Sequence, residues 1–143
     1  MANRQFQQFN YSLEKGLVRL YARVNIGATG APTLVTTTSN SGNPSNGIAT
    51  VTRSSAGKYV FTFGNVGSTQ TNLDTYQRLV WCQANVINAT ISTVVSTQIS
   101  AEAVTTVTAP TVTIQCLAAA GTAVDPNNGD VLLVEFVLKN ATV

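Results

Sequence analysis

Apolar and polar residues alternate almost without interruption over residues 15–26, which read KGLVRLYARVNI. One phase is apolar, and the other carries Arg19, Tyr21 and Arg23. Alternation with a period of two predicts a β-strand that places one face on a core and presents the other to water or to a partner. A helix fits this stretch less well, because it would put the two arginines on different sides of its apolar stripe. We expect this strand to lie in the middle of a sheet.

Similar alternation recurs at residues 48–53, 58–63, 78–85, 111–118 and 131–139. Residues 54–57 join the first two of these runs and predict a hairpin, because Gly57 can adopt a positive φ at the end of the turn. Tyr59, Phe61 and Phe63 share one face and are expected in the core. Residues 131–139 are apolar on both faces, which predicts a central strand. We expect this strand to form an antiparallel, hairpin-like pair with residues 111–118.

The apolar phase changes from Ile87 onward, and we therefore expect a bulge or a turn near Asn85. Val80 is predicted to point inward with the other even-numbered apolar residues of this strand, and Trp81 is predicted to lie in the core. Short strands are expected at residues 33–38 and 104–108, and turn residues cluster at 39–47 and 121–130. No segment has a convincing helical period. These elements predict an all-β fold, either an antiparallel β-sandwich or a jelly-roll-like barrel.

The first 14 residues differ from the rest of the chain, because they are polar and rich in Gln but contain Phe6, Phe9 and Tyr11. Three aromatic residues in a polar segment either fold back on the domain or dock on a neighbour. We favour the second interpretation. The sequence therefore predicts an extended N-terminal arm at residues 1–14, followed by a single β-sandwich domain at residues 15–143.

The composition points to a surface with few charges. Of the 143 residues, 44% are hydrophobic and 10% are charged, against about 25% charged residues in typical soluble domains. We expect much of a surface built from hydroxyls and amides to be covered by other subunits; a secreted Ser/Thr-rich β-domain is the alternative. The N-terminus has no apolar signal region, and no run of about 18 apolar residues occurs. These features predict synthesis in the cytoplasm and no membrane partner.

The net charge is only +2, and the basic residues are scattered along the chain. A nucleic-acid-binding domain would cluster its Lys and Arg residues, so no nucleic-acid partner is expected. The closest grouping, Lys15, Arg19 and Arg23, lies along one strand face. A face that contacts solvent or another subunit explains this grouping better than a stacking platform.

The residues available for catalysis are few. The chain contains no histidine, which removes the commonest general base and metal ligand. The six acidic residues show no spacing typical of a catalytic carboxylate pair. Asp125 and Asp130 flank a turn that could bind Ca²⁺, although Asx-rich turns need no ion. Cys82 and Cys116 are predicted to be buried free thiols rather than a disulfide. We expect no enzymatic activity, no catalytic residues, no metal and no cofactor.

Three stretches, at residues 16–34, 47–63 and 118–140, resemble small virion structural proteins of tailed bacteriophages. The resemblance implies an all-β capsid decoration (cement) protein located on the capsid surface of the virion, made in the host bacterial cytoplasm and often trimeric. Its expected partners are the major capsid protein and further copies of itself as a homotrimer. Tyr and Arg are enriched at interfaces, so we expect contacts with a subunit or with the capsid through these side chains: Phe6, Phe9, Tyr11, Arg19, Tyr21 and Arg23.

Two alternatives remain open from the sequence. One is a tail or adaptor component of the same virion. The other is a carbohydrate-binding β-sandwich module that uses Trp81 or Tyr21 as a platform for a sugar ring.

Overall fold

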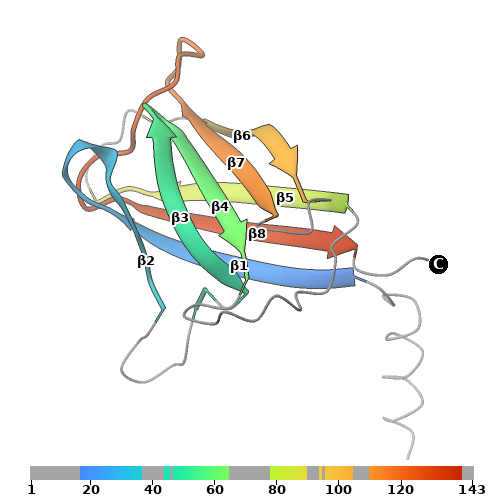
Figure 1. Cartoon of the computed structure of the whole chain (residues 1–143). Coiled ribbons are helices and arrows are strands. Elements are labelled where there is room, and N and C mark those ends of the chain that lie inside the picture. Colours follow the sequence, from blue (N-terminus) through green and yellow to red (C-terminus); the bar gives the residue numbers. More distant parts are fainter. Residues whose placement is uncertain are drawn as a thin grey trace, which may run out of the picture.

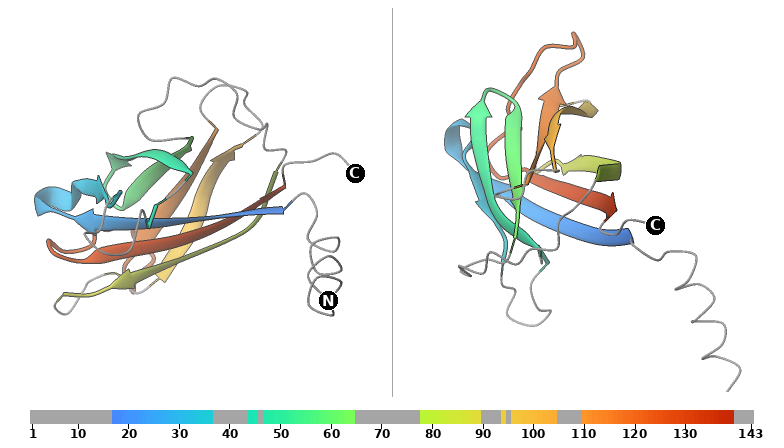
Figure 2. Two further views of the ribbon diagram at one scale, coloured as in Figure 1. Left: turned by 90° about the horizontal axis from the view of Figure 1, so that it is seen from below. Right: turned by 45° about the vertical axis from the view of Figure 1, so that its right-hand side comes forward.

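The computed structural model describes residues 17–36, 44–45, 47–64, 78–89, 94, 96–104 and 110–139. Two antiparallel four-stranded sheets face each other as a sandwich, and the strands of one sheet cross those of the other at a steep angle (Figure 1; Figure 2). The predicted all-β sandwich is confirmed. The N-terminal arm, with Phe6, Phe9 and Tyr11, lies outside the described residues.

The first sheet, which we call sheet A, has the strand order β2-β1-β8-β5. Its strands are β1 (Leu17–Ile26), β2 (Pro32–Leu34), β5 (Arg78–Ile87) and β8 (Val131–Lys139). The second, sheet C, has the order β3-β4-β7-β6, with β3 (Ile48–Ser55), β4 (Lys58–Phe63), β6 (Ser96–Ala103) and β7 (Thr111–Leu117). A short 3-10 turn, η1 (Ala28–Gly30), joins β1 to β2.

The predicted hairpin of β3 and β4 is present, with Gly57 at φ +70° in its turn. Strand β8 lies between β1 and β5 and is central, as expected. The predicted pairing of β7 with β8 is wrong, because β7 pairs with β4 and β6 in the opposite sheet. Residues 118–130 cross from one sheet to the other, which a tight hairpin turn would not allow.

The core lies between the two inner faces and follows the alternation of the strands. Phe136 of sheet A packs against Phe61 and Phe63 of sheet C, with ring centroids 5.3 Å and 5.0 Å apart. Tyr59 is also fully buried. The edge-to-face and tilted arrangements are the favoured geometries for aromatic pairs, so these rings join the two sheets at the centre of the sandwich.

The Asp125 carboxylate holds the crossing segment at one end of the sandwich. It accepts two hydrogen bonds from Arg53, at 2.9 Å and 2.7 Å, and one from the Gly57 N–H at 2.8 Å. The buried Tyr59 hydroxyl lies 3.1 Å from both Asp125 Oδ1 and the Gly30 carbonyl oxygen. This network connects η1, the β3–β4 turn and residues 118–130.

Strand β5 is an edge of sheet A, and two side chains from β6 contact its open side. Thr97 Oγ1 donates a hydrogen bond to the Ala84 carbonyl at 2.7 Å, and Glu102 accepts one from the Leu79 N–H at 2.9 Å. These bonds connect β5 to β6 where the two sheets meet along one side of the sandwich.

Candidate functional site

The outer face of sheet A presents the polar phase of β1 beside the outward residues of β8 and β5. The register places Tyr21 opposite Glu135, and Glu135 opposite Gln83. One step along the strands, Arg23 is opposite Leu133, which is opposite Asn85. Side chains from three strands therefore form two adjacent rows on one surface.

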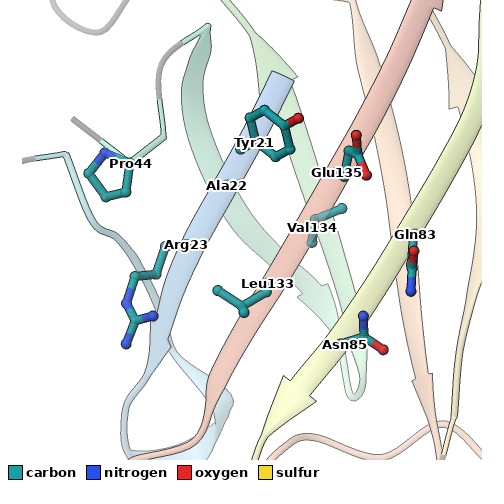
Figure 3. Close-up of a pocket in the computed structure, with 9 residues that line it drawn as sticks. All are labelled: Tyr21, Ala22, Arg23, Pro44, Gln83, Asn85, Leu133, Val134 and Glu135. Atoms are coloured by element: carbon teal, nitrogen blue, oxygen red, sulfur yellow. The ribbon is translucent and has the colours of Figure 1, made fainter. Parts of the chain in front are cut away.

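These rows line an open hollow with a volume of about 370 Å³ (Figure 3). Leu133 of β8 forms its floor, and Gln83 and Asn85 line the β5 side. The volume falls at the lower end of the range of about 300–1,000 Å³ that is typical of ligand clefts.

Pro44 completes the hollow on the β1 side, and its neighbour Ser45 anchors this loop to β1. The buried Ser45 Oγ accepts a hydrogen bond from the Arg23 N–H at 3.0 Å and lies 3.3 Å from the Arg23 carbonyl oxygen. The Arg23 carbonyl also accepts a bond of 2.8 Å from the Val35 N–H. These contacts place Pro44 beside Arg23 at the rim of the hollow.

Arg19 and Glu135 form an ion pair on this face, with Arg19 Nη1 3.1 Å from Glu135 Oε1. Both side chains are partly exposed, and such surface pairs contribute only about 0–1 kcal/mol to stability. The pair fixes the direction of the Glu135 carboxylate more than it stabilises the fold.

An apolar patch lies next to the hollow, and we call it the ridge: Leu17, Val80, Trp81 and Val137. Val137 is only 5% exposed although it faces outward, and the register places it between Arg19 and Trp81. Leu17 and Val80 are exposed, and Trp81 is 45% exposed. Contiguous apolar surface of this kind marks interaction sites more often than scattered exposed residues do.

The exposure of Trp81 corrects two predictions. Trp81 is in the outward phase of β5 with Gln83 and Asn85, and a bulge between Leu79 and Trp81 turns Leu79 toward the core and leaves Val80 exposed. Trp81 is therefore not a core residue and Val80 does not point inward. No bulge lies at Asn85, since β5 runs in regular register from Trp81 to Ile87; the strand ends at Ile87 and the chain bends at Ala89.

Three of the predicted contact residues, Arg19, Tyr21 and Arg23, lie together on this outer face. Tyr21 is 53% exposed. The other three, Phe6, Phe9 and Tyr11, are outside the described residues. Sequence reasoning missed Gln83, Asn85 and Leu133, because only the register of β5 and β1 on β8 brings them beside Tyr21.

The carboxylates of Asp125 and Asp130 in the acidic turn both accept hydrogen bonds from groups of the protein itself. Hydrogen bonds from Arg53, and then from the Gly57 N–H and the Tyr59 hydroxyl, lower the pKa of Asp125 despite the opposing effect of its partial burial. The buried Asp130 carboxylate accepts bonds from the Ala89 and Asn127 N–H groups at 2.9 Å and 2.8 Å. Within the described ranges, no group of three or more potential metal-ligating side chains occurs.

The two cysteines are free thiols. Cys116 is fully buried and Cys82 is half-buried on the inner side of β5. Burial raises the pKa of each thiol to about 12, with a smaller effect from Glu135 on Cys82 and from Asp125 on Cys116. Since the thiolate is the reactive form, both groups are poor nucleophiles in the folded protein.

Comparison of the chain with protein-family models, with curated proteins and with solved structures gave no match. A separate search for membrane spans found, over the described parts of the chain, no helix with the length and apolar character to cross a membrane.

Proposed function

We propose that the protein is a structural component of a bacteriophage virion, and specifically a capsid decoration protein. In this proposal the ridge on sheet A docks on neighbouring protein subunits, which are further copies of the chain in a homotrimer and the major capsid protein. The protein would be made in the host cytoplasm and reside on the outer surface of the capsid.

The observation that carries this proposal is the exposed ridge around Val137. Trp81 and Leu17 present apolar surface beside Arg19, and Trp and Arg are the residue types most enriched at the energetic centres of interfaces. The resemblance of residues 16–34, 47–63 and 118–140 to virion proteins adds support from the sequence.

Lattice binding explains why a small contact would suffice. Only three of the four ridge residues, Leu17, Val80 and Trp81, are exposed, so a single contact would be weak. A trimer that engages several lattice sites at once gains avidity, because each later contact forms at a high effective concentration. A role of this kind is non-enzymatic and requires no cofactor.

The proposal is tested by binding the protein to capsids prepared without it. We expect Trp81→Ala and Arg19→Glu each to weaken cosedimentation with these capsids by about tenfold or more, because a central Trp or Arg commonly contributes over 1.4 kcal/mol. Light scattering over a range of concentrations measures the oligomeric state of the same samples.

Ile99→Ala is the matched control, because Ile99 is as exposed as Trp81, at 45%, but lies on β6 of the other sheet. The control should bind like the wild type, and circular dichroism should show the same β-rich spectrum for every variant. Absence of capsid binding by the wild type, or wild-type binding by both Trp81→Ala and Arg19→Glu, would overturn the proposal.

A further inference from the structure

The hollow next to the ridge combines an exposed aromatic ring, two side-chain amides that make no hydrogen bond to the described residues, and an apolar floor (Figure 3). From this combination we propose that the hollow binds a neutral saccharide, with Tyr21 as the stacking platform and Gln83 and Asn85 as the hydrogen-bonding groups. This inference does not depend on the proposed function, because it concerns the isolated protein in solution.

The apolar part of the hollow suits the carbon face of a sugar ring. Tyr21 is 53% exposed, and its ring stands at the edge of the hollow beside Glu135. Leu133 lies between the β1 side and the β5 side as an apolar floor. A tyrosine side chain has an apolar ring and a polar hydroxyl tip, so Tyr21 can pack against C–H groups while its hydroxyl contacts water or ligand.

The polar part of the hollow suits hydroxyl groups. Within the described residues, the side chains of Gln83 and Asn85 make no hydrogen bond to the protein. Each amide offers two donors and a carbonyl acceptor. Neighbouring sugar hydroxyls both donate and accept, so they match such amides better than a purely acidic or purely basic site.

The size of the hollow fits a short saccharide. Tyr21 and Gln83 lie opposite each other across β8, which separates their Cα atoms by about 10 Å at the usual strand spacing. The two rows are offset by about 7 Å along the strands.

A second hollow of about 320 Å³ extends the surface over the edge of β5. Asn85 lines both hollows, and the second is lined further by Asn88, Ser96 and Thr97. No charged residue is among its described lining residues. The path from Tyr21 across Asn85 to this edge is therefore an amide- and hydroxyl-lined track along which a saccharide chain can continue.

The charges around the first hollow are too few to favour a polyanionic ligand. Its lining contains one basic side chain, Arg23, and one acidic side chain, Glu135, which is paired with Arg19, so these three side chains carry a net charge of only +1. Single-stranded nucleic acid also stacks on aromatic residues, but it requires a positively charged groove that follows the phosphates. The small net charge of the first hollow and the uncharged lining of the second make that ligand the less suitable one.

The test is a glycan array of neutral oligosaccharides built from glucose, galactose, mannose and N-acetylglucosamine, probed with the full-length protein. Isothermal titration calorimetry then measures the Kd of the strongest binder for each variant. We expect a Kd below about 1 mM for the wild type. Tyr21→Ala should raise it at least about tenfold, because aromatic stacking is commonly worth over 1.4 kcal/mol.

Tyr21→Phe keeps the ring and should bind within about threefold of the wild type, a change of under 1 kcal/mol. Gln83→Ala combined with Asn85→Ala should weaken binding about tenfold, since two hydrogen bonds are lost. Gln98→Ala is the matched control, because Gln98 is an exposed glutamine on β6 outside both hollows, and it should leave the Kd unchanged.

Three results would overturn the inference. The first is no binding of any neutral glycan on the array with a Kd below about 1 mM. The second is binding that Tyr21→Ala and the double amide variant leave unchanged. The third is binding of a single-stranded oligothymidylate, but of no neutral glycan, that depends on Tyr21. Capsid binding by Trp81→Ala and Arg19→Glu is measured separately, so failure here is distinguishable from failure of the proposed function.

Discussion

Removing the hydroxyl of Tyr59 should destabilise the protein through one buried hydrogen-bonding group. Tyr59 is fully buried, and its hydroxyl lies 3.1 Å from both Asp125 Oδ1 and the Gly30 carbonyl. Tyr59→Phe keeps the ring in place and leaves these two oxygens without that donor. Hydrogen bonds to charged groups contribute about 1.5–3 kcal/mol, so we expect a loss of about 2 kcal/mol in the free energy of unfolding.

This loss can be converted to a melting temperature. The unfolding entropy of a chain of this length is about 0.3 kcal/mol per degree. A loss of about 2 kcal/mol in the free energy of unfolding therefore lowers Tm by about 7 °C. Urea unfolding followed by circular dichroism measures the same quantity. Tyr21→Phe is the matched control, because Tyr21 is exposed, and its effect should stay within about 0.5 kcal/mol.

The destabilisation should also depend on pH. Because the pKa of Asp125 is lowered in the folded state from its ordinary 3.8, its stabilising contribution is present above that value. It is lost as the pH falls below 3.8, through the lower pKa of the folded state. Since the Tyr59 hydroxyl is one cause of the shift, the difference between wild type and Tyr59→Phe should shrink over that acidic range. A difference below about 0.5 kcal/mol at neutral pH, or one that stays constant into acid, would refute the reasoning.

One further variant and one chemical reagent test the packing and burial of the core. Phe136→Ala removes the ring that contacts Phe61 and Phe63 across the sheets and should cost about 3–5 kcal/mol in urea unfolding; a cost under about 1 kcal/mol would contradict the described packing. Cys116 is fully buried and its pKa is raised to about 12, so a thiol reagent at neutral pH should modify it only after unfolding. Rapid modification of Cys116 in the folded protein, located by peptide mass spectrometry, would contradict that burial.

The alternation in the sequence was sufficient to predict most of the core and seven of the eight strands, but not β6, whose side chains are largely exposed. Residues 58–63 and 131–139 carry the two inward phases that meet at Phe61 and Phe136, because burial of one face enforces a period of two. The same pattern specifies which face is buried but not which strand lies alongside. The sequence therefore led to an incorrect pairing of β7 with β8.

The candidate site was predictable only in part. The polar phase of β1 indicated Arg19, Tyr21 and Arg23, because those side chains alternate with a buried set. Trp81 was misplaced because the apolar character of its strand was followed instead of its phase, which is that of the exposed Gln83 and Asn85. Val80 was misplaced because a single extra residue at the β5 bulge reverses the orientation of the chain before it. The hollow depends on the registers of three strands separated by long stretches of sequence, and no local pattern encodes that register.

The contacts that β6 makes with the edge of β5 bear on how copies of this chain can meet at high concentration. An open strand edge offers unpaired N–H and C=O groups to any other chain, which is a common route to aggregation. Here the Ala84 carbonyl and the Leu79 N–H are already bonded to Thr97 and Glu102. Continuation of sheet A past β5 by another molecule would first have to break these bonds. Along this edge, crowding of many copies would therefore favour contacts between side-chain surfaces over the growth of a continuous intermolecular sheet.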